Sequence, residues 1–166
     1  MKIYSMKYVN TQIVFQEIPN EVSLAINISN CPCKCLNCHS SYLAEDIGEE
    51  LNIESLSNLI FKNKGITCIC FMGGDAQPEY LNKLAISIKL RSDFPYKVAW
   101  YSGREEISNK IDLTLFDYIK IGPYKEEFGP LNSKTTNQKF YKVNHNNIDN
   151  TYILEDCTYL FQKGKF

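Results

Sequence analysis

Three cysteines near the beginning of the chain, Cys31, Cys35 and Cys38, stand in the order Cys-x3-Cys-x2-Cys. Thiolates this close together can hold an iron–sulfur cluster, and a four-iron cluster normally takes four of them. A set of three leaves one iron without a protein ligand. A small molecule can bind there, as at the open position of catalytic zinc sites. The motif therefore indicates a reactive cluster rather than a passive electron carrier.

A structural zinc site is the alternative interpretation of these cysteines, because Cys35 and Cys38 form a Cys-x2-Cys pair. Four further residues offer donor atoms, namely Cys33, His39, Cys68 and Cys70. Structural zinc sites usually take two well-spaced pairs, each on its own turn. Cys68 and Cys70 are separated by one residue, so on a strand both point to one face, which suits packing as well as chelation. Spacing alone does not decide between an iron–sulfur cluster and a zinc ion.

Length and composition favour one globular domain of 166 residues with a hydrophobic core. The formal net charge of -1 gives no electrostatic reason to expect a nucleic-acid partner. The first residues contain no apolar signal-peptide segment, and no apolar run is long enough to span a bilayer. We therefore expect a cytoplasmic protein without a membrane partner. Its seven cysteines favour metal binding or buried thiols over a disulfide framework.

Strands and helices are predicted to alternate along the middle of the chain, from the spacing of the apolar residues. The predicted strands are Val22–Ile28, Ile66–Met72, Lys97–Tyr101 and Phe116–Ile121. The predicted helices are Ile53–Lys64 and about Pro78–Arg91, and a capping-box pattern at Ser102–Glu105 indicates a further helix start. Such alternation favours parallel strands joined by right-handed crossovers.

The fold class expected from this pattern is α/β, a single domain over residues 1–166 forming an incomplete, open, partial TIM-like β/α barrel. The strand–helix units number only about half of those in a closed eight-unit barrel. An N-terminal edge strand or hairpin is expected within about residues 1–18, and a C-terminal hairpin within about residues 139–166. We expect the open side to admit part of a large partner, since a small substrate usually needs a more enclosed pocket.

Polar or glycine-rich segments follow all four predicted strands, and ligands of α/β folds bind at the carboxyl ends of strands. In chain order these segments are the cysteine motif, Gly73–Asp75, Tyr101–Arg104 and Lys120–Pro123. The sequence thus predicts that they meet at one edge of the sheet. An isolated zinc site does not require that convergence, so the placement favours the cluster.

These residues resemble the radical S-adenosylmethionine superfamily, whose signature is the spacing of Cys31, Cys35 and Cys38. Gly73–Asp75 looks like the family's Gly-Gly-acid segment after the second strand. Thr135–Lys139, with the sequence Thr-Thr-Asn-Gln-Lys, is similar to a Ser/Thr-x-Asn-Gln-Arg segment of the activating proteins of anaerobic ribonucleotide reductase. The resemblance covers most of the chain and points to this family of glycyl-radical-enzyme activases.

The resemblance implies that Cys31, Cys35 and Cys38 ligate a [4Fe–4S] cluster whose fourth iron binds S-adenosylmethionine. The residues implied to bind that cofactor are His39, Gly73, Gly74, Asp75, Ser102 and Arg104. Glycine permits close backbone approach to the methionyl ammonium and Asp75 supplies the countercharge. Ser102, with Arg104, stands where a donor to the methionyl carboxylate is expected. His39 follows a ligand directly, so it either contacts the cofactor or packs in the loop.

The implied activity is that of an oxidoreductase that cleaves S-adenosylmethionine reductively to a 5'-deoxyadenosyl radical, which takes a hydrogen from a glycine of a larger reductase. The implied partners are anaerobic ribonucleotide reductase and an electron donor such as flavodoxin or ferredoxin. Such chemistry belongs to the cofactors, and the protein supplies binding and orientation. Two alternatives are a radical enzyme acting on another glycyl radical enzyme, peptide or small molecule, and a zinc-stabilised binding module.

Two positions depart from the family pattern. Asn37 stands where an aromatic residue often packs on the adenine, and Lys139 replaces an arginine. Cys33 lies inside the motif and is a spare thiol or an alternative ligand, the unligated role being favoured because the spacing is complete without it. Cys157 is predicted to be a packing residue in the C-terminal hairpin.

Overall fold

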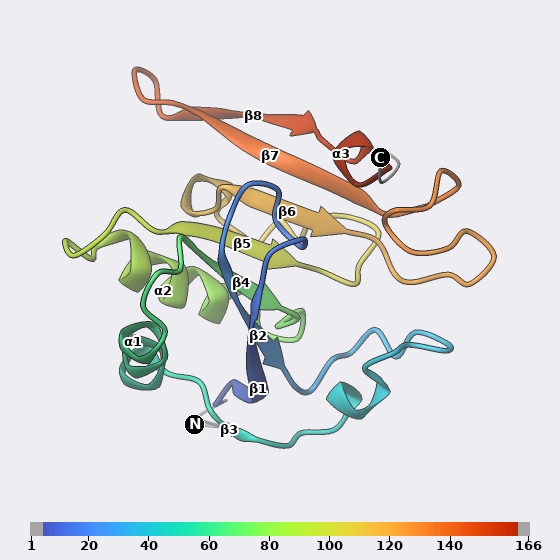
Figure 1. Cartoon of the computed structure of the whole chain (residues 1–166), viewed down its shortest axis with the longest axis horizontal. Coiled ribbons are helices and arrows are strands. Elements are labelled where there is room, and N and C mark those ends of the chain that lie inside the picture. Colours follow the sequence, from blue (N-terminus) through green and yellow to red (C-terminus); the bar gives the residue numbers. More distant parts are fainter. Residues whose placement is uncertain (1–4, 163–166) are drawn as a thin grey trace.

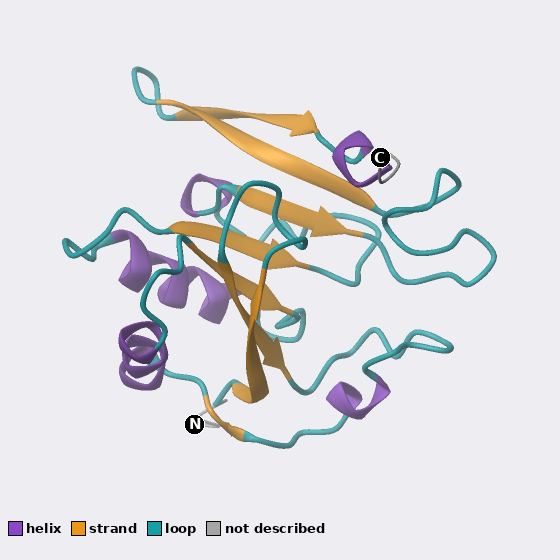
Figure 2. Cartoon of the chain, in the orientation of Figure 1, coloured by secondary structure: helices purple, strands orange, loops and turns teal. Residues whose placement is uncertain are grey.

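One mixed β-sheet runs through residues 5–162, the part of the chain that this computed structural model describes (Figures 1 and 2). The strands are β1 (Lys7–Val14), β2 (Ser23–Ile28), β3 (Glu49–Glu50), β4 (Cys68–Met72), β5 (Lys97–Tyr101), β6 (Tyr118–Ile121), β7 (Lys139–Asn146) and β8 (Thr151–Asp156). The helices are α1 (Ile53–Lys62), α2 (Pro78–Lys89) and α3 (Tyr159–Gln162). The strand order is β3-β1-β2-β4-β5-β6-β7-β8.

The centre of the sheet is parallel and its two sides are antiparallel. β2, β4, β5 and β6 are parallel neighbours. β1 runs antiparallel to β2, and β3 pairs with β1 beyond it. On the other side β7 runs antiparallel to β6, and β8 returns along β7 as a hairpin. The carboxyl ends of the four central strands therefore lie at one edge of the sheet.

Helices α1 and α2 lie on the same face of the sheet (Figure 1). α1 begins with a capping box, in which the Asn52 side chain accepts from the Ser55 backbone N–H at 2.9 Å and the Ser55 hydroxyl accepts from that of Asn52 at 2.9 Å. α2 begins at Pro78, whose fixed φ suits the first helical position. The described helix bounds lie within two residues of those expected from the sequence.

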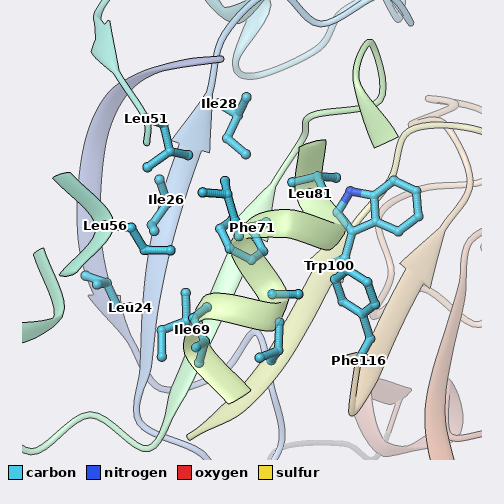
Figure 3. Close-up of a cluster of buried hydrophobic side chains, with 14 of the residues drawn as sticks. Leu24, Ile26, Ile28, Leu51, Leu56, Ile69, Phe71, Leu81, Trp100 and Phe116 are labelled. Carbon is cyan, nitrogen blue, oxygen red and sulfur yellow. The ribbon is translucent and has the colours of Figure 1, made fainter. Parts of the chain in front are cut away.

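The main hydrophobic core lies between these two helices and the sheet (Figure 3). Phe71 of β4, Trp100 of β5 and Leu81 of α2 are fully buried there. Alternate residues of the same strands point to the opposite face, where Cys68, Cys70, Ala99, Phe140 and Cys157 form a second cluster with Ile18. The predicted packing role of Cys157 is confirmed, and Cys68 and Cys70, for which the spacing left packing and chelation open, are packing residues that share one face.

The predicted partial TIM-like barrel is wrong. The described residues form an eight-stranded mixed sheet with three short helices, instead of a repeated strand–helix pattern. The reason lies in the outer strands: β1, β7 and β8 pair antiparallel and extend the sheet on both sides, where a barrel needs further parallel strands with crossover helices. Residues 1–4 and 163–166, within the segments assigned to terminal hairpins, lie outside the described residues.

The helix expected to begin at Ser102 is also absent from the described structure. The chain between β5 and β6 is irregular apart from a short 3-10 turn at Leu113–Leu115. Ser102 does use its hydroxyl as an N-cap residue does, accepting from the Arg104 backbone N–H at 3.1 Å. The same hydroxyl also donates to Asp75, and the Gly103 N–H points to that carboxylate too. These contacts hold the turn in a non-helical course across the edge of the sheet.

Candidate functional site

The segments that follow the four parallel strands contact one another at the carboxyl edge of the sheet. The Gly73 N–H donates to the Tyr101 carbonyl at 3.0 Å, and the Ser102 N–H donates to the Lys120 carbonyl at 2.8 Å. The Gly122 N–H then donates to the Arg104 carbonyl at 2.6 Å. The cysteine segment (residues 29–46) joins this edge through Cys33, whose sulfur lies 3.8 Å from a carboxylate oxygen of Asp75. The predicted convergence is confirmed.

The cysteine segment leaves β2 and is held at its base by backbone hydrogen bonds. The Cys31 N–H donates to the Leu43 carbonyl at 2.8 Å, and the Asn30 N–H donates to the Glu45 carbonyl at 2.9 Å. The buried Leu43 side chain anchors the return of the segment. Between these anchors, Cys31, Cys35 and Cys38 are free thiols and partly exposed, so they are accessible to a metal.

Asp75 is the hydrogen-bonding centre of the edge. Its side chain is only 5% exposed. One carboxylate oxygen accepts from the Ser102 hydroxyl at 2.5 Å, and the other accepts from the Gly103 N–H at 3.0 Å and faces the Cys33 thiol. Two ionised oxygens offer about four acceptor positions. At least one position therefore remains for a cationic ligand.

Gly73 and Gly74 bring the backbone close to its neighbours beside Asp75. Both have positive φ, +106° and +89°, a region that glycine enters without the steric cost of a Cβ. A Cβ on Gly74 would lie 3.0 Å from the Leu81 side chain. The Gly73 carbonyl accepts from the Trp100 indole N–H at 2.8 Å, so the glycine turn is fixed to the core.

Lys120 belongs to a segment that the sequence placed at this edge, but the sequence reasoning gave it no role of its own in the site. Its side chain is 9% exposed, and its ammonium donates to the Gly122 carbonyl at 2.8 Å. Burial lowers the pKa of Lys120 to about 8, while the negative charges of Cys35, Asp75, Cys33 and Cys38 act in the opposite direction. Its position in β6 could have indicated this. Ile119 and Ile121 belong to the main core, so Lys120 between them points to the opposite face of the sheet, away from α1 and α2, which we call the open face.

Asp75 and Lys120 are the two buried residues among all Asp, Glu, Lys and Arg side chains of residues 5–162. Such residues are almost never buried unless they are paired, because desolvating a charge is costly. Both lie at the edge that carries the cysteine motif, and the two charges act on each other. This placement marks the edge as a functional site.

Two other predicted site residues, His39 and Arg104, lie at the rim, as does Asn37, one of the positions that depart from the family pattern. The exposed His39 ring lies 5.6 Å from the Tyr124 ring, which comes from the segment after β6. Arg104 is exposed, and its charge lowers the pKa of Cys33 against the larger effects of burial and Asp75, which raise it to about 12. The Asn37 amide donates to Glu126 at 2.8 Å. His39 and Asn37 therefore tie the cysteine segment to the loop after β6.

The Thr-Thr-Asn-Gln-Lys segment, residues 135–139, holds the turn after β6 by hydrogen bonds. The Asn137 amide donates to the Pro123 carbonyl at 3.0 Å, and the buried Gln138 amide donates to the Gly122 carbonyl at 3.4 Å. That carbonyl also accepts from Lys120. Gly122 has φ of +106°, and a Cβ there would lie 3.0 Å from the Gln138 Cα. The segment thus fixes the turn that holds Lys120.

The thiols are not arranged as a ready-made metal site. Within residues 5–162, no group of three or more His, Cys, Asp or Glu side chains is placed to hold a metal ion. The donor set nevertheless suits an iron–sulfur cluster, since thiolates are its usual ligands. A thiolate-ligated cluster is anionic, and the buried Lys120 lies near enough to Cys35, Cys33 and Cys38 for their negative charges to raise its pKa. The types of donor residue therefore fit such a cluster.

A groove of about 720 Å³ adjoins this edge on the face opposite α1 and α2. Its walls come from the loop between β1 and β2, the loop after β6, and α3. Phe15, Leu131 and Phe161 give it an apolar lining. Tyr101 also lines the groove; its hydroxyl donates to the Glu17 carbonyl, and its ring lies 5.9 Å from the Lys120 ammonium. Tyr101 thus connects the groove to the site.

No protein-family model, curated protein or solved structure matches this chain. Among residues 5–162, no helix is both long and apolar enough to cross a membrane.

Replacing Gly74 by alanine is expected to destabilise the chain more than the same change at Gly65. Both glycines have φ near +90°, so both variants carry the backbone cost of about 1–2 kcal/mol. Only Gly74 adds a close contact, because nothing lies within 4 Å of a Cβ at Gly65. Gly74→Ala should lose roughly 1–3 kcal/mol more in urea unfolding. Equal losses would show that the Leu81 contact does not constrain the turn.

The motif thiols are expected to react with iodoacetamide well before the core thiols in cluster-free protein at pH 8. Burial is the main cause that raises the pKa of Cys68 from 9.0 to about 12, which lowers its thiolate fraction roughly 1,000-fold. Cys70 is equally inaccessible. Peptide mass mapping over time should show Cys31, Cys35 and Cys38 modified first. Simultaneous modification of Cys68 would contradict the described packing.

Proposed function

We propose that this chain is a radical S-adenosylmethionine activase that generates a glycyl radical on a larger enzyme, anaerobic ribonucleotide reductase. Cys31, Cys35 and Cys38 would ligate a [4Fe–4S] cluster. The observation that carries the proposal is the burial of Asp75 and Lys120, one anion and one cation, at the sheet edge that bears this three-thiol motif. A site with these charges and an incomplete ligand set suits a cluster that binds a zwitterionic amino-acid group.

The turn at Gly73 and Gly74 suits the methionyl part of the cofactor. Asp75 retains acceptor capacity for an ammonium group, and the glycines allow close approach of the backbone. Ser102 contributes chiefly by orienting Asp75, since its hydroxyl already donates to that carboxylate. The exposed Arg104 is free to turn toward a carboxylate at the rim. Asp75 thus binds the ammonium and Ser102 positions Asp75.

If bound, the cluster and S-adenosylmethionine would supply the one-electron reductive chemistry needed to remove a hydrogen atom from the partner's glycine. The residues of the chain bind and orient these groups and shield them from solvent. Tyr124 and His39 close the rim beside the cysteine segment. The half-buried Tyr101 ring and the buried Lys120 ammonium lie 5.9 Å apart, where the site adjoins the groove on the open face.

The groove on the open face favours a large substrate over a small one. Its apolar lining from three separate segments, the β1–β2 loop, the loop after β6 and α3, suits a polypeptide segment better than a small polar molecule. Because Tyr101 lines both the groove and the site, a segment lying in the groove would approach the cluster. An electron donor such as flavodoxin or ferredoxin would dock elsewhere, at the exposed cysteine segment.

The zinc-stabilised module is the weaker alternative. Cys68 and Cys70 lie fully buried in the cluster with Phe140 and Cys157, so they offer no accessible second pair to Cys35 and Cys38. A radical enzyme acting on another peptide or glycyl radical enzyme uses the same site. It is separated from the activase of the reductase by the identity of the partner that acquires a radical.

Anaerobic reconstitution with iron and sulfide tests the proposal. The wild type should take up iron and, with dithionite and S-adenosylmethionine, release 5'-deoxyadenosine. Single Ala variants of Cys31, Cys35 and Cys38 should fall below about one hundredth of that activity. Cys157→Ala, a thiol outside the site, and Cys33→Ala should keep the cluster.

The partner is tested by adding the co-encoded reductase and recording its electron paramagnetic resonance spectrum. A glycyl radical doublet is expected only with the complete mixture. Cofactor cleavage without this signal would move the assignment to another peptide substrate. Stoichiometric zinc with no iron uptake would overturn the radical function altogether.

A further inference from the structure

Lys120 is a buried cation without an ion-pair partner in the described part of the chain. Its ammonium donates to a backbone carbonyl, that of Gly122, and no carboxylate lies within 4.0 Å of it. It also lies over the Tyr101 ring at 5.9 Å, a contact that partly compensates a cation's desolvation. An incompletely compensated buried charge is expensive to keep. Its presence indicates that an anion belongs nearby.

The surrounding charges show where that anion belongs. After burial, the strongest influence on Lys120 is the negative charge of Cys35, followed by those of Asp75, Cys33 and Cys38. Two of these thiols are proposed cluster ligands, although Lys120 lies far from them in sequence. Asp75 is not the ion-pair partner of Lys120, because neither of its oxygens lies within 4.0 Å of the ammonium. The Asp75 carboxylate contacts both the Cys33 thiol and the Ser102 hydroxyl, and the Ser102 N–H donates to the Lys120 carbonyl, so the missing anion belongs on the cysteine side of this hydrogen-bonded edge.

We propose that Lys120 is the counter-cation of the cluster and that its charge stabilises the cluster's reduced state. This inference rests on the proposed function. One electron enters from the donor and makes the thiolate-ligated cluster more negative by one charge, while no bond forms or breaks and Lys120 keeps its proton. A fixed cation in a poorly hydrated site favours the more negative state. Lys120 is thus a positioning charge that makes the cluster easier to reduce.

The backbone around Lys120 keeps this charge in place. The Gly122 carbonyl that accepts from the ammonium also accepts from Gln138, and the Lys120 carbonyl accepts from the Ser102 N–H. The cation therefore belongs to the same hydrogen-bonded edge as Asp75. Because it is buried, its influence on the cluster should be little screened by salt.

The test compares three variants of reconstituted protein in the absence of S-adenosylmethionine. Lys120→Met removes the charge at similar volume, and Lys120→Arg retains it. Lys125→Met is the matched control, because Lys125 lies at the exposed rim and pairs with Glu105 at 2.9 Å. Cluster midpoint potentials are measured by redox titration, with electron paramagnetic resonance of the reduced cluster as the readout.

Lys120→Met should shift the midpoint potential to a more negative value, by a similar amount at low and high salt. Lys120→Arg should stay close to the wild type, and Lys125→Met should shift little. An unchanged potential in Lys120→Met with full iron content would overturn the inference, as would equal shifts in the Met and Arg variants. If the wild type itself binds no iron, the proposed function fails first and the inference falls with it.

Thermal unfolding of the cluster-free variants shows whether the Lys120 charge is needed for the stability of the fold or only for the cluster. Replacing an incompletely paired buried cation by an apolar side chain of similar size removes a desolvation cost. Cluster-free Lys120→Met should therefore unfold at the same temperature as the wild type or above it. A marked loss of stability would show that the ammonium is needed for folding, and would overturn its assignment as a charge reserved for the cluster.

Discussion

The parallel pairing of β2, β4, β5 and β6 is the constraint on which the rest of the structure depends. It places the ends of four strands at one edge, so residues from Cys31 to Gly122 meet there although they are far apart in the sequence. The backbone bonds from Gly73 to Tyr101, Ser102 to Lys120 and Gly122 to Arg104 then join neighbouring segments across this edge. Without the shared direction of the strands, the cysteine motif would be an isolated loop.

Much of this arrangement could be predicted from local sequence patterns. The bounds of β5 and the starts of α1 and α2 are as expected, because apolar periodicity and capping residues act over a few positions. The barrel prediction failed because pairing of the outer strands is not local: nothing in Lys139–Asn146 states that it lies antiparallel to β6. Likewise, Ser102 has the residue pattern of a helix start, but the non-local carboxylate of Asp75 engages its hydroxyl.

The spacing of residues in the sequence did not reveal which charged side chains of the site are buried. Motif comparison pointed to Asp75, and the structure adds Lys120, whose burial depends on how the face of β6 opposite the main core is covered. The late Asn137–Gln138 pair was linked only to a resemblance, and its contacts now give it a physical role in holding the Gly122 turn. Cys68 and Cys70, which spacing left available for zinc, belong to an apolar cluster on the opposite face from the main core.

The central claim is that three thiolates hold a cluster with one open iron. Mössbauer spectroscopy of protein reconstituted with ⁵⁷Fe, before and after adding S-adenosylmethionine, tests it most directly. The account predicts that a single iron site of the cluster changes its isomer shift on addition, as an incomplete ligand set requires. Iron sites that are all thiolate-ligated and unaffected by the added compound would contradict the account.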